Sequence, residues 1–214
     1  MKFLAALVHA TAATQLWFTT FVNQPLDVET RNPYRAYSGE VWKIRFRTPS
    51  IAEYGNVPGT GDSSTLTIEN FKFSVKMPKH IPKNASMWLL PYLSPSIFGW
   101  PTGPPVATTR IPISDSVDGV HFQWTPEPPI IVTPNTTYWF QLDSTSETLE
   151  DAPMWLHGDI GFSSENDPME NMKLGVEQDR RFTTISRHKI RFAPSLQVYA
   201  KHTFCAEVPL RGAP

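Results

Sequence analysis

The sequence predicts an all-β protein: an antiparallel β-sandwich of jelly-roll type, with long loops and at most one short helix. Proline accounts for 21 of the 214 residues, roughly twice its usual share of about 5%. Aromatic residues make up 12% of the chain, whereas charged residues make up only 18%. Short runs of alternating apolar and polar residues lie between turn residues, which is typical of half-buried antiparallel strands.

One domain is expected over residues 15–200, because a single sandwich often reaches this size. Residues 1–14 resemble a signal peptide, with a positive charge at Lys2, an apolar run and the small residues Ala10-Thr11-Ala12. Secretion to the extracellular space follows from this interpretation. The alternative is a short first strand in a protein that is not secreted. Residues 201–214 are expected to form an irregular tail.

The expected strands follow one another with loops rich in proline, glycine, serine and aspartate between them, and residues 49–62 form one such loop. Regular turn signals between short strands favour a sandwich or a barrel over alternating βα units. The strands are expected at residues 16–22, 41–48, 65–77, 86–93, 106–111, 120–124, 130–133, 137–142, 154–157, 190–192 and 196–200.

Two of these strands carry clear patterns. Residues 41–48 place Trp42, Ile44 and Phe46 on one face and three cations on the other, which predicts an antiparallel strand with its charged face in solvent. In residues 65–77 the apolar positions shift phase by one residue. Such a shift puts side chains on the wrong face unless the strand is bulged or broken, and we place this irregularity at Glu69-Asn70.

Residues 143–179 hold ten of the 20 acidic residues and a single base. Calcium binding by Asp159, Glu165, Asp167 and Glu170 is one interpretation, although no EF-hand spacing is present. A solvated acidic loop that pairs with Arg180 and Arg181 is the other. Within this segment, residues 163–175 are expected to form a loop or the one short helix.

Composition and motifs exclude several functions. The net charge of −1 argues against a general nucleic-acid binder, and no apolar run is long enough for a membrane-spanning helix. The lone Cys205 rules out an intrachain disulfide framework, and its role stays open. Six scattered histidines show no ligand spacing; an N-terminal copper site at His9 would need an implausibly short leader. With no nucleotide or hydrolase motif either, no cofactor is expected.

Aromatic residues in loops are the best functional lead. Flat aromatic faces on a rigid scaffold can stack on sugar rings, and loops often carry binding sites. Core packing is the alternative for each of these residues, and it is the expected role of Trp42, Trp88, Trp124 and Trp139 in the strands. The candidate ligand-binding residues are Tyr92, Phe98, Trp100 and Trp155.

Two sequons, Asn84-Ala85-Ser86 and Asn135-Thr136-Thr137, are candidate N-glycosylation sites if the protein is secreted. Both lie beside turn residues, where an acceptor asparagine is exposed.

Several segments, together spanning roughly residues 60–200, resemble the choice-of-anchor R type of extracellular β-sandwich domain. The resemblance implies a non-enzymatic surface domain, here without the family's anchor. The most distinctive piece is residues 132–142, which contains Asn135-Thr136-Thr137-Tyr138-Trp139. The other pieces are residues 66–77, 87–92, 99–108 and 194–200.

We therefore expect a secreted, non-catalytic β-sandwich protein that acts in surface or matrix attachment or binds glycans. One alternative is an extracellular polysaccharide-active enzyme that uses carboxylates or a metal. Another is a structural subunit of an extracellular assembly. The expected partners are glycans or cell-surface components, and the oligomeric state is open.

Overall fold

A computed structural model describes residues 8–11, 14–20, 34–37, 40–50, 65–77, 87–113, 120–162, 173–178, 181–184 and 191–206. These residues form β-strands, turns and loops with no helix among them, which confirms the all-β prediction. The expected loop at 49–62 and the possible helix at 163–175 lie mostly outside the described residues. Within the latter, residues 173–175 begin a strand instead.

The first sheet is antiparallel, and β5 lies at its centre. β18 and β13 pair along one edge of β5, whereas β10 and β11 pair along the other; Val75 of β5 lies opposite Trp155 on the first edge and opposite Val120 on the second. The sheet consists of β1 (Val8–Thr11), β2 (Gln15–Thr19), β3 (Tyr34–Arg35), β5 (Thr65–Lys76), β10 (Val120–Trp124), β11 (Ile130–Val132), β13 (Met154–Trp155) and β18 (Gln197–Ala206).

The second sheet carries the candidate site, and its central strands run in the order β15-β4-β12-β6. It consists of β4 (Glu40–Arg47), β6 (Met87–Ile97), β7 (Trp100–Pro101), β8 (Ala107–Thr108), β9 (Ile111–Ile113), β12 (Thr137–Ser144), β15 (Lys173–Gln178) and β16 (Arg181–Thr184). A small third sheet pairs β14 (His157–Phe162) with β17 (Arg191–Pro194).

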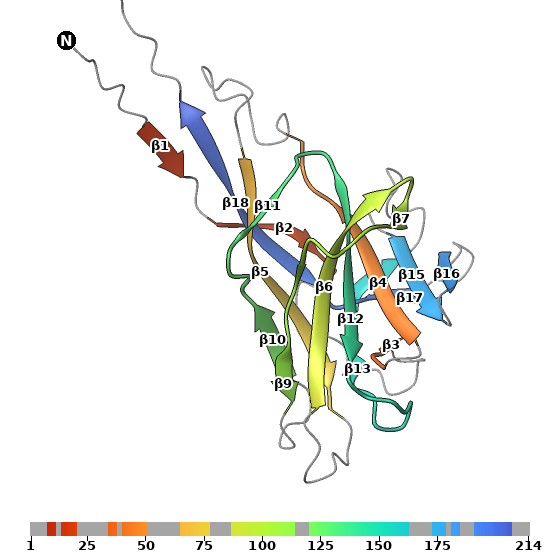
Figure 1. Ribbon diagram of the computed structural model, residues 1–214. Helices are drawn as coiled ribbons and strands as arrows, with labels where there is room; N and C mark the ends of the chain where they lie inside the picture. Colours follow the sequence, from red (N-terminus) through yellow and green to blue (C-terminus); the bar gives the residue numbers. More distant parts are fainter. Residues whose placement is uncertain are drawn as a thin grey trace, which may run out of the picture.

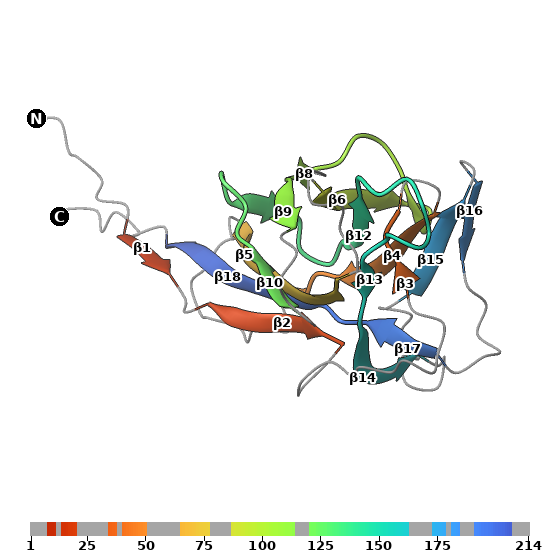
Figure 2. The ribbon, with the colours of Figure 1, turned by 90° about the horizontal axis from the view of Figure 1, so that it is seen from below.

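The two large sheets pack face to face through aromatic side chains. Phe140 of β12 lies 5.1 Å from Phe71 and 5.6 Å from Phe73 of β5, measured between ring centroids. All three side chains are buried. Burying rings of this size supplies much of the hydrophobic stabilisation of a sandwich. Figures 1 and 2 show the two layers, with β5 and β18 in one and β4, β6 and β12 in the other.

The phase shift in β5 is a bulge. In the pairing with β18, Tyr199 lies opposite Asn70 and Ala200 lies opposite Ile68, so Glu69 has no opposing residue. The extra residue returns the apolar side chains to the core face, and Ile68 and Phe71 are both fully buried. The irregularity expected at Glu69-Asn70 is therefore confirmed.

The ends of the chain differ from expectation. β18 continues to Ala206, so the irregular tail expected from residue 201 is wrong for its first six residues. The cause is pairing with β5 as far as Thr203 and with β1 from Thr203 to Ala206, where Thr11 lies opposite Thr203 and Val8 opposite Ala206. β1 falls within the expected signal peptide, whose cleavage stays a prediction.

Candidate functional site

A row of polar side chains crosses the outer face of the second sheet. Lys43 of β4 lies opposite Gln141 of β12, and Gln141 lies opposite Tyr92 of β6. Because side chains alternate across a strand, these residues point away from the core that their neighbours Ile44, Phe140 and Leu93 fill. The sheet therefore presents three hydrogen-bonding side chains side by side.

The segment after β6 covers this row. β6 and β7 form a hairpin in which Ser96 lies opposite Pro101. The chain then returns along β6, where the amide of Thr102 donates to the carbonyl of Pro95 at 3.2 Å and that of Val106 to Leu93 at 2.7 Å. These contacts hold a proline- and glycine-rich roof over the sheet. The covered groove has a volume of about 310 Å³, and its walls include Pro101, Gly103 and Pro105.

Strand β15 supplies the other wall. It pairs with β4 so that Glu177 lies opposite Val41, beside Lys43. The ammonium of Lys43 donates to the Glu177 carboxylate, which is the salt bridge of the groove. The Lys43 side chain is only 6% exposed, whereas that of Glu177 is 38% exposed. The Glu177 carboxylate therefore compensates the charge of a buried ammonium.

Two of the three cations of β4 are buried, whereas the sequence predicts all three in solvent. Lys43 and Arg45 are 4% and 7% exposed. Arg45 lies beneath the hairpin, where its Nη1 atom is 3.6 Å from the position that a Cβ on Gly99 would occupy. The prediction of a solvated charged face is wrong, because β15 on one side and the hairpin on the other cover it.

Asp143 of β12 completes the charged part of the groove. One carboxylate oxygen accepts a hydrogen bond of 2.7 Å from the backbone amide of Ser144. Burial raises the pKa of Asp143 above its ordinary value. The Ser144 hydrogen bond and the positive charge of Lys43 offset part of this rise, and the negative charge of Glu177 adds to it. The site therefore holds a carboxyl group whose environment favours the neutral form.

Tyr92 is the aromatic side chain of the groove. Burial raises the pKa of its phenol; the charge of Asp143 contributes to the rise, and that of Arg110 opposes it. The phenol therefore keeps its proton and can donate as well as accept a hydrogen bond. A perturbed acid and a perturbed phenol in one cavity are characteristic of functional sites.

Neutral side chains order the floor of the groove, which Ser94 and Gln141 form, and the part of the sheet next to it. The Nε2 atom of Gln141 donates to Ser94 Oγ at 2.7 Å, and the Nε1 atom of Trp139 donates to Ser96 Oγ at 3.1 Å. Trp139 is fully buried beneath the hairpin. Because these groups are held by one another, the floor is ordered before any ligand arrives, which lowers the entropic cost of binding.

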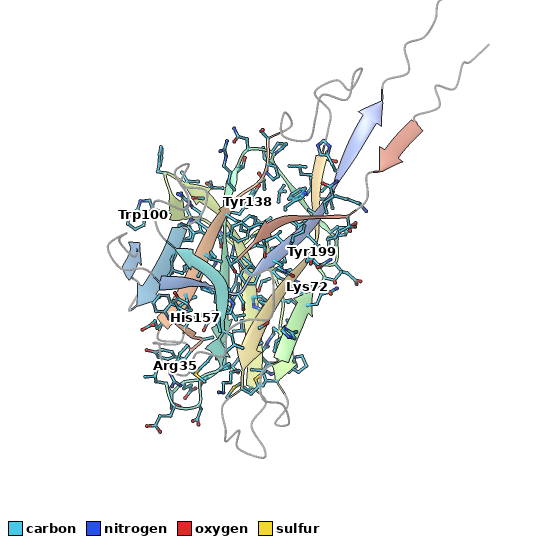
Figure 3. The ribbon with its side chains drawn as sticks, turned by 180° about the vertical axis from the view of Figure 1, so that it is seen from behind. Arg35, Lys72, Trp100, Tyr138, His157 and Tyr199 are labelled. Carbon is cyan, nitrogen blue, oxygen red and sulfur yellow. The ribbon has the colours of Figure 1, made fainter. Side chains whose placement is uncertain are left out.

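The residues predicted to bind ligand separate in the structure. Tyr92 lies in the groove, whereas Phe98 and Trp100 lie at the tip of the hairpin, with 97% and 47% of their surface exposed. Cross-strand pairing puts Trp100 opposite Ile97 and on the hairpin face that does not carry Pro101. Figure 3 shows Trp100 at the periphery of the molecule. The aromatic residues therefore do not form one stacking platform.

Trp155 is a core residue, which corrects its prediction as a ligand-binding residue. It is 1% exposed, its ring lies 5.6 Å from that of Phe140, and its Nε1 atom donates to the carbonyl of Ser195 at 2.8 Å. Its acidic neighbours in the sequence suggested a surface position. However, β13 pairs with β5 and directs the indole between the sheets.

Of the two sequons, Asn84 lies outside the described residues. Asn135 is exposed at the turn between β11 and β12, where its φ of 54° is one that asparagine tolerates. Its Oδ1 atom accepts a hydrogen bond from Arg47. Glycosylation at either asparagine stays a prediction.

Sequence reasoning missed Lys43, Gln141 and Asp143 as site residues. The signal for the last two was the outward phase of β12, in which Trp139, Gln141 and Asp143 alternate with the core residues Tyr138, Phe140 and Leu142. The sequence does not indicate that Asp143 and Glu177 meet. They belong to strands separated by β4, and only the strand order brings them together.

A second depression and a contact between Ser74 and His121 lie outside the groove. A depression of about 610 Å³ lies between β8 and the connection from β10 to β11, but its only ionisable lining residue is Glu127. The Oγ atom of Ser74 lies 2.7 Å from His121 Nδ1, yet Ser74 is 1% exposed and no described carboxylate contacts that histidine. This arrangement does not provide an accessible nucleophile. In the described ranges no three metal-ligating side chains lie together.

No protein-family model, curated protein or solved structure matches this chain. The part of the chain that the structure describes holds no helix long and apolar enough to cross a membrane.

Proposed function

We propose that this protein is a secreted, non-catalytic β-sandwich that binds glycans through the groove on the second sheet. The observation that supports it best is the convergence of Tyr92, Gln141, Asp143 and Lys43 under the proline–glycine roof. Sugars present hydroxyl groups that both donate and accept hydrogen bonds. A binding site for them needs ordered donors and acceptors beside an aromatic surface.

The size of the groove limits the ligand. Its volume of about 310 Å³ is near the lower end of small-molecule sites, which span about 300–1,000 Å³. Such a groove accommodates the end or a short branch of a glycan rather than a long segment of a polysaccharide chain. Attachment of the protein to a cell surface or matrix would follow from this binding.

Glycan-array binding and titration calorimetry test the proposal. We expect Asp143→Asn and Tyr92→Phe each to weaken binding about tenfold or more, because one hydrogen bond to a charged or buried partner is worth about 1.5–3 kcal/mol. Glu147→Gln is the matched control, since it makes the same kind of change at an exposed position outside the groove. Absence of glycan binding by the wild-type protein, or equal binding by all variants, would contradict the proposal.

A glycoside hydrolase is the second candidate, and one observation favours it. Asp143, whose neutral form is stabilised, shares the groove with Glu177, whose carboxylate is paired with Lys43. Glycosidases use one carboxylic acid as a proton donor and one carboxylate as a nucleophile or base. Sugar release from a panel of polysaccharides, abolished by Glu177→Gln and by Asp143→Asn, would favour this candidate over simple binding.

Secretion and the likeness to choice-of-anchor R domains belong to the same proposal. N-terminal sequencing of protein exported by a eukaryotic host should place the mature start near residue 15. Enzymatic deglycosylation should lower its mass if Asn84 or Asn135 is modified. A start at Met1 and an unchanged mass would remove this part of the proposal without affecting the groove.

A further inference from the structure

The hairpin between β6 and β7 turns through two residues that both have left-handed backbone conformations. Ile97 pairs with Trp100, so Phe98 and Gly99 form the turn, with φ values of 52° and 84°. Positive φ at both central residues defines the type I′ turn of tight hairpins. This geometry favours Asn-Gly or Gly-Gly, whereas the sequence here is Phe-Gly.

Phenylalanine is an unfavourable residue for the first position. A left-handed conformation brings the Cβ of a bulky residue too close to the backbone. Phe98 is also 97% exposed, so its ring gains almost nothing from packing in the fold. A residue that is both strained in its backbone and unpacked in its side chain does not stabilise the fold, which suggests that it contacts a partner.

The side chains around Phe98 are apolar as well. Ile97 is 52% exposed and Trp100 is 47% exposed, and the two face each other across the hairpin. We define Ile97, Phe98 and Trp100 as the apolar tip. It is a narrow projection rather than a broad patch, and Figure 3 shows its Trp100 at the edge of the molecule.

The chain around the apolar tip is cationic. Arg47 of β4 has a partly exposed side chain, and the charge of Arg45 lies buried beneath Gly99. The described segments that form this end of the sheet, residues 44–50, 94–106 and 133–139, contain no aspartate or glutamate. The apolar tip therefore projects from a region of positive charge, to which anionic surfaces are attracted.

We propose that the apolar tip inserts into the headgroup region of an anionic phospholipid membrane. Phe98 and Ile97 would enter the acyl boundary, Trp100 would lie at the headgroup level where tryptophan is favoured, and Arg47 would approach lipid phosphates. A protein partner is less suitable, because stable protein interfaces cover about 800 Å² per partner and three side chains at a tip cover far less. Binding by three side chains is weak and reversible.

Vesicle co-sedimentation of the full chain tests this inference. The protein should bind vesicles that contain phosphatidylserine, bind phosphatidylcholine vesicles at least several-fold more weakly, and dissociate as salt is raised. Trp100 lies near the lipid only in the proposed orientation. Lipids brominated on their acyl chains should therefore quench fluorescence in the wild type, but not in a Trp100→Phe variant.

Phe98→Asn separates membrane binding from folding. It creates the favoured Asn-Gly turn, so its melting temperature should equal or exceed that of the wild type, while vesicle binding falls at least tenfold. Ile131→Ser is the matched control, because it removes an apolar side chain that is 68% exposed on β11; its vesicle binding should match that of the wild type.

Three outcomes would overturn the inference. They are undiminished vesicle binding by Phe98→Asn, an equal loss in Ile131→Ser, and a wild-type dimer in ultracentrifugation that Phe98→Asn dissociates, which would make the tip a self-association surface. Glycan binding is measured on the same variants. Since the groove lies under the other face of the hairpin, either proposal can fail while the other holds.

Discussion

Asp143 is a residue of the groove whose negative charge is disfavoured by its surroundings. Its carboxyl group is partly buried, and the fold stabilises the neutral form. At neutral pH the carboxylate must ionise in an environment that disfavours its charge, which costs folding free energy. Groups retained at such a cost are characteristic of binding and catalytic sites.

The sign of the pH dependence follows from the raised pKa. Because the folded-state pKa of Asp143 lies above its unfolded value, the stability it contributes is present below the unfolded pKa and is lost as pH rises through the folded pKa. We expect Asp143→Asn to melt at a higher temperature than the wild type near pH 7, with a difference that shrinks near pH 3. Thermal unfolding followed by circular dichroism at both pH values measures this.

Glu147→Gln is the control for that experiment, because its exposed side chain should leave the melting temperature unchanged at either pH. A lower melting temperature for Asp143→Asn at neutral pH would mean that the carboxylate is stabilised by its neighbours. The conclusion that the fold raises the pKa of Asp143 would then be wrong.

At the scale of elements, the junction between β2 and the third sheet depends on close backbone approach. A Cβ on Gly158 of β14 would lie 2.1 Å from the carbonyl oxygen of Thr20, just after β2. Thr20 cannot move away easily. Its amide donates to the carbonyl of Leu196 at 2.9 Å, and its hydroxyl accepts from the Leu196 amide at 2.7 Å.

Gly158→Ala should therefore destabilise the protein. Forced overpacking of a rigid site typically costs about 1–3 kcal/mol and occasionally more, which lowers the melting temperature by about 2–4 °C per kcal/mol for a chain of this size. Gly103→Ala is the comparison. A Cβ there meets no atom within 4 Å, although φ is 76°, so its cost is limited to about 1–2 kcal/mol of backbone strain. A smaller effect at Gly158 than at Gly103 would contradict the close approach.

The strands with strong alternation could be predicted from the sequence, and the elements without it could not. β10 has the expected bounds, and the bulge in β5 lies at the expected residue. β15 and β16 were missed because their few apolar residues stand among charged ones in short strands. Alternation also says which side chains share a face but not what covers that face, so Lys43 and Arg45 were wrongly expected in solvent.

The groove was hidden from sequence reasoning for a related reason. Tyr92 was identified because an aromatic residue beside a proline–glycine loop is conspicuous in a sequence. Asp143 and Glu177 come from near the two ends of the acidic segment, and their proximity depends on β4 lying between β12 and β15. Strand order in a sandwich is set by long-range pairing, which local patterns do not encode.

At the scale of the whole molecule, a strand near the start of the chain pairs with a strand near its end. β1 pairs with the last residues of β18, from Thr203 to Ala206. β5 accompanies β18 only from Gln197 to Thr203, and β2 only from Gln197 to Ala200. β1 is therefore the strand that holds residues 204–206 in the sheet. It belongs to the segment that is expected to be removed on secretion.

A protein that begins at Gln15 should consequently keep its fold and lose order only at its end. We expect its melting temperature to lie within about 2 °C of that of the full chain. Of the residues removed, Val8–Thr11 pair with the end of β18, and the lost contact of Thr14 with Glu69 is exposed and contributes little. Hydrogen exchange should be faster for backbone amides of residues 204–206 in the shorter protein, and unchanged for those of residues 197–202. A fall of more than about 5 °C in melting temperature, or faster exchange throughout β18, would mean that residues 1–14 belong to the folded domain, and the interpretation of this segment as a signal peptide would be untenable.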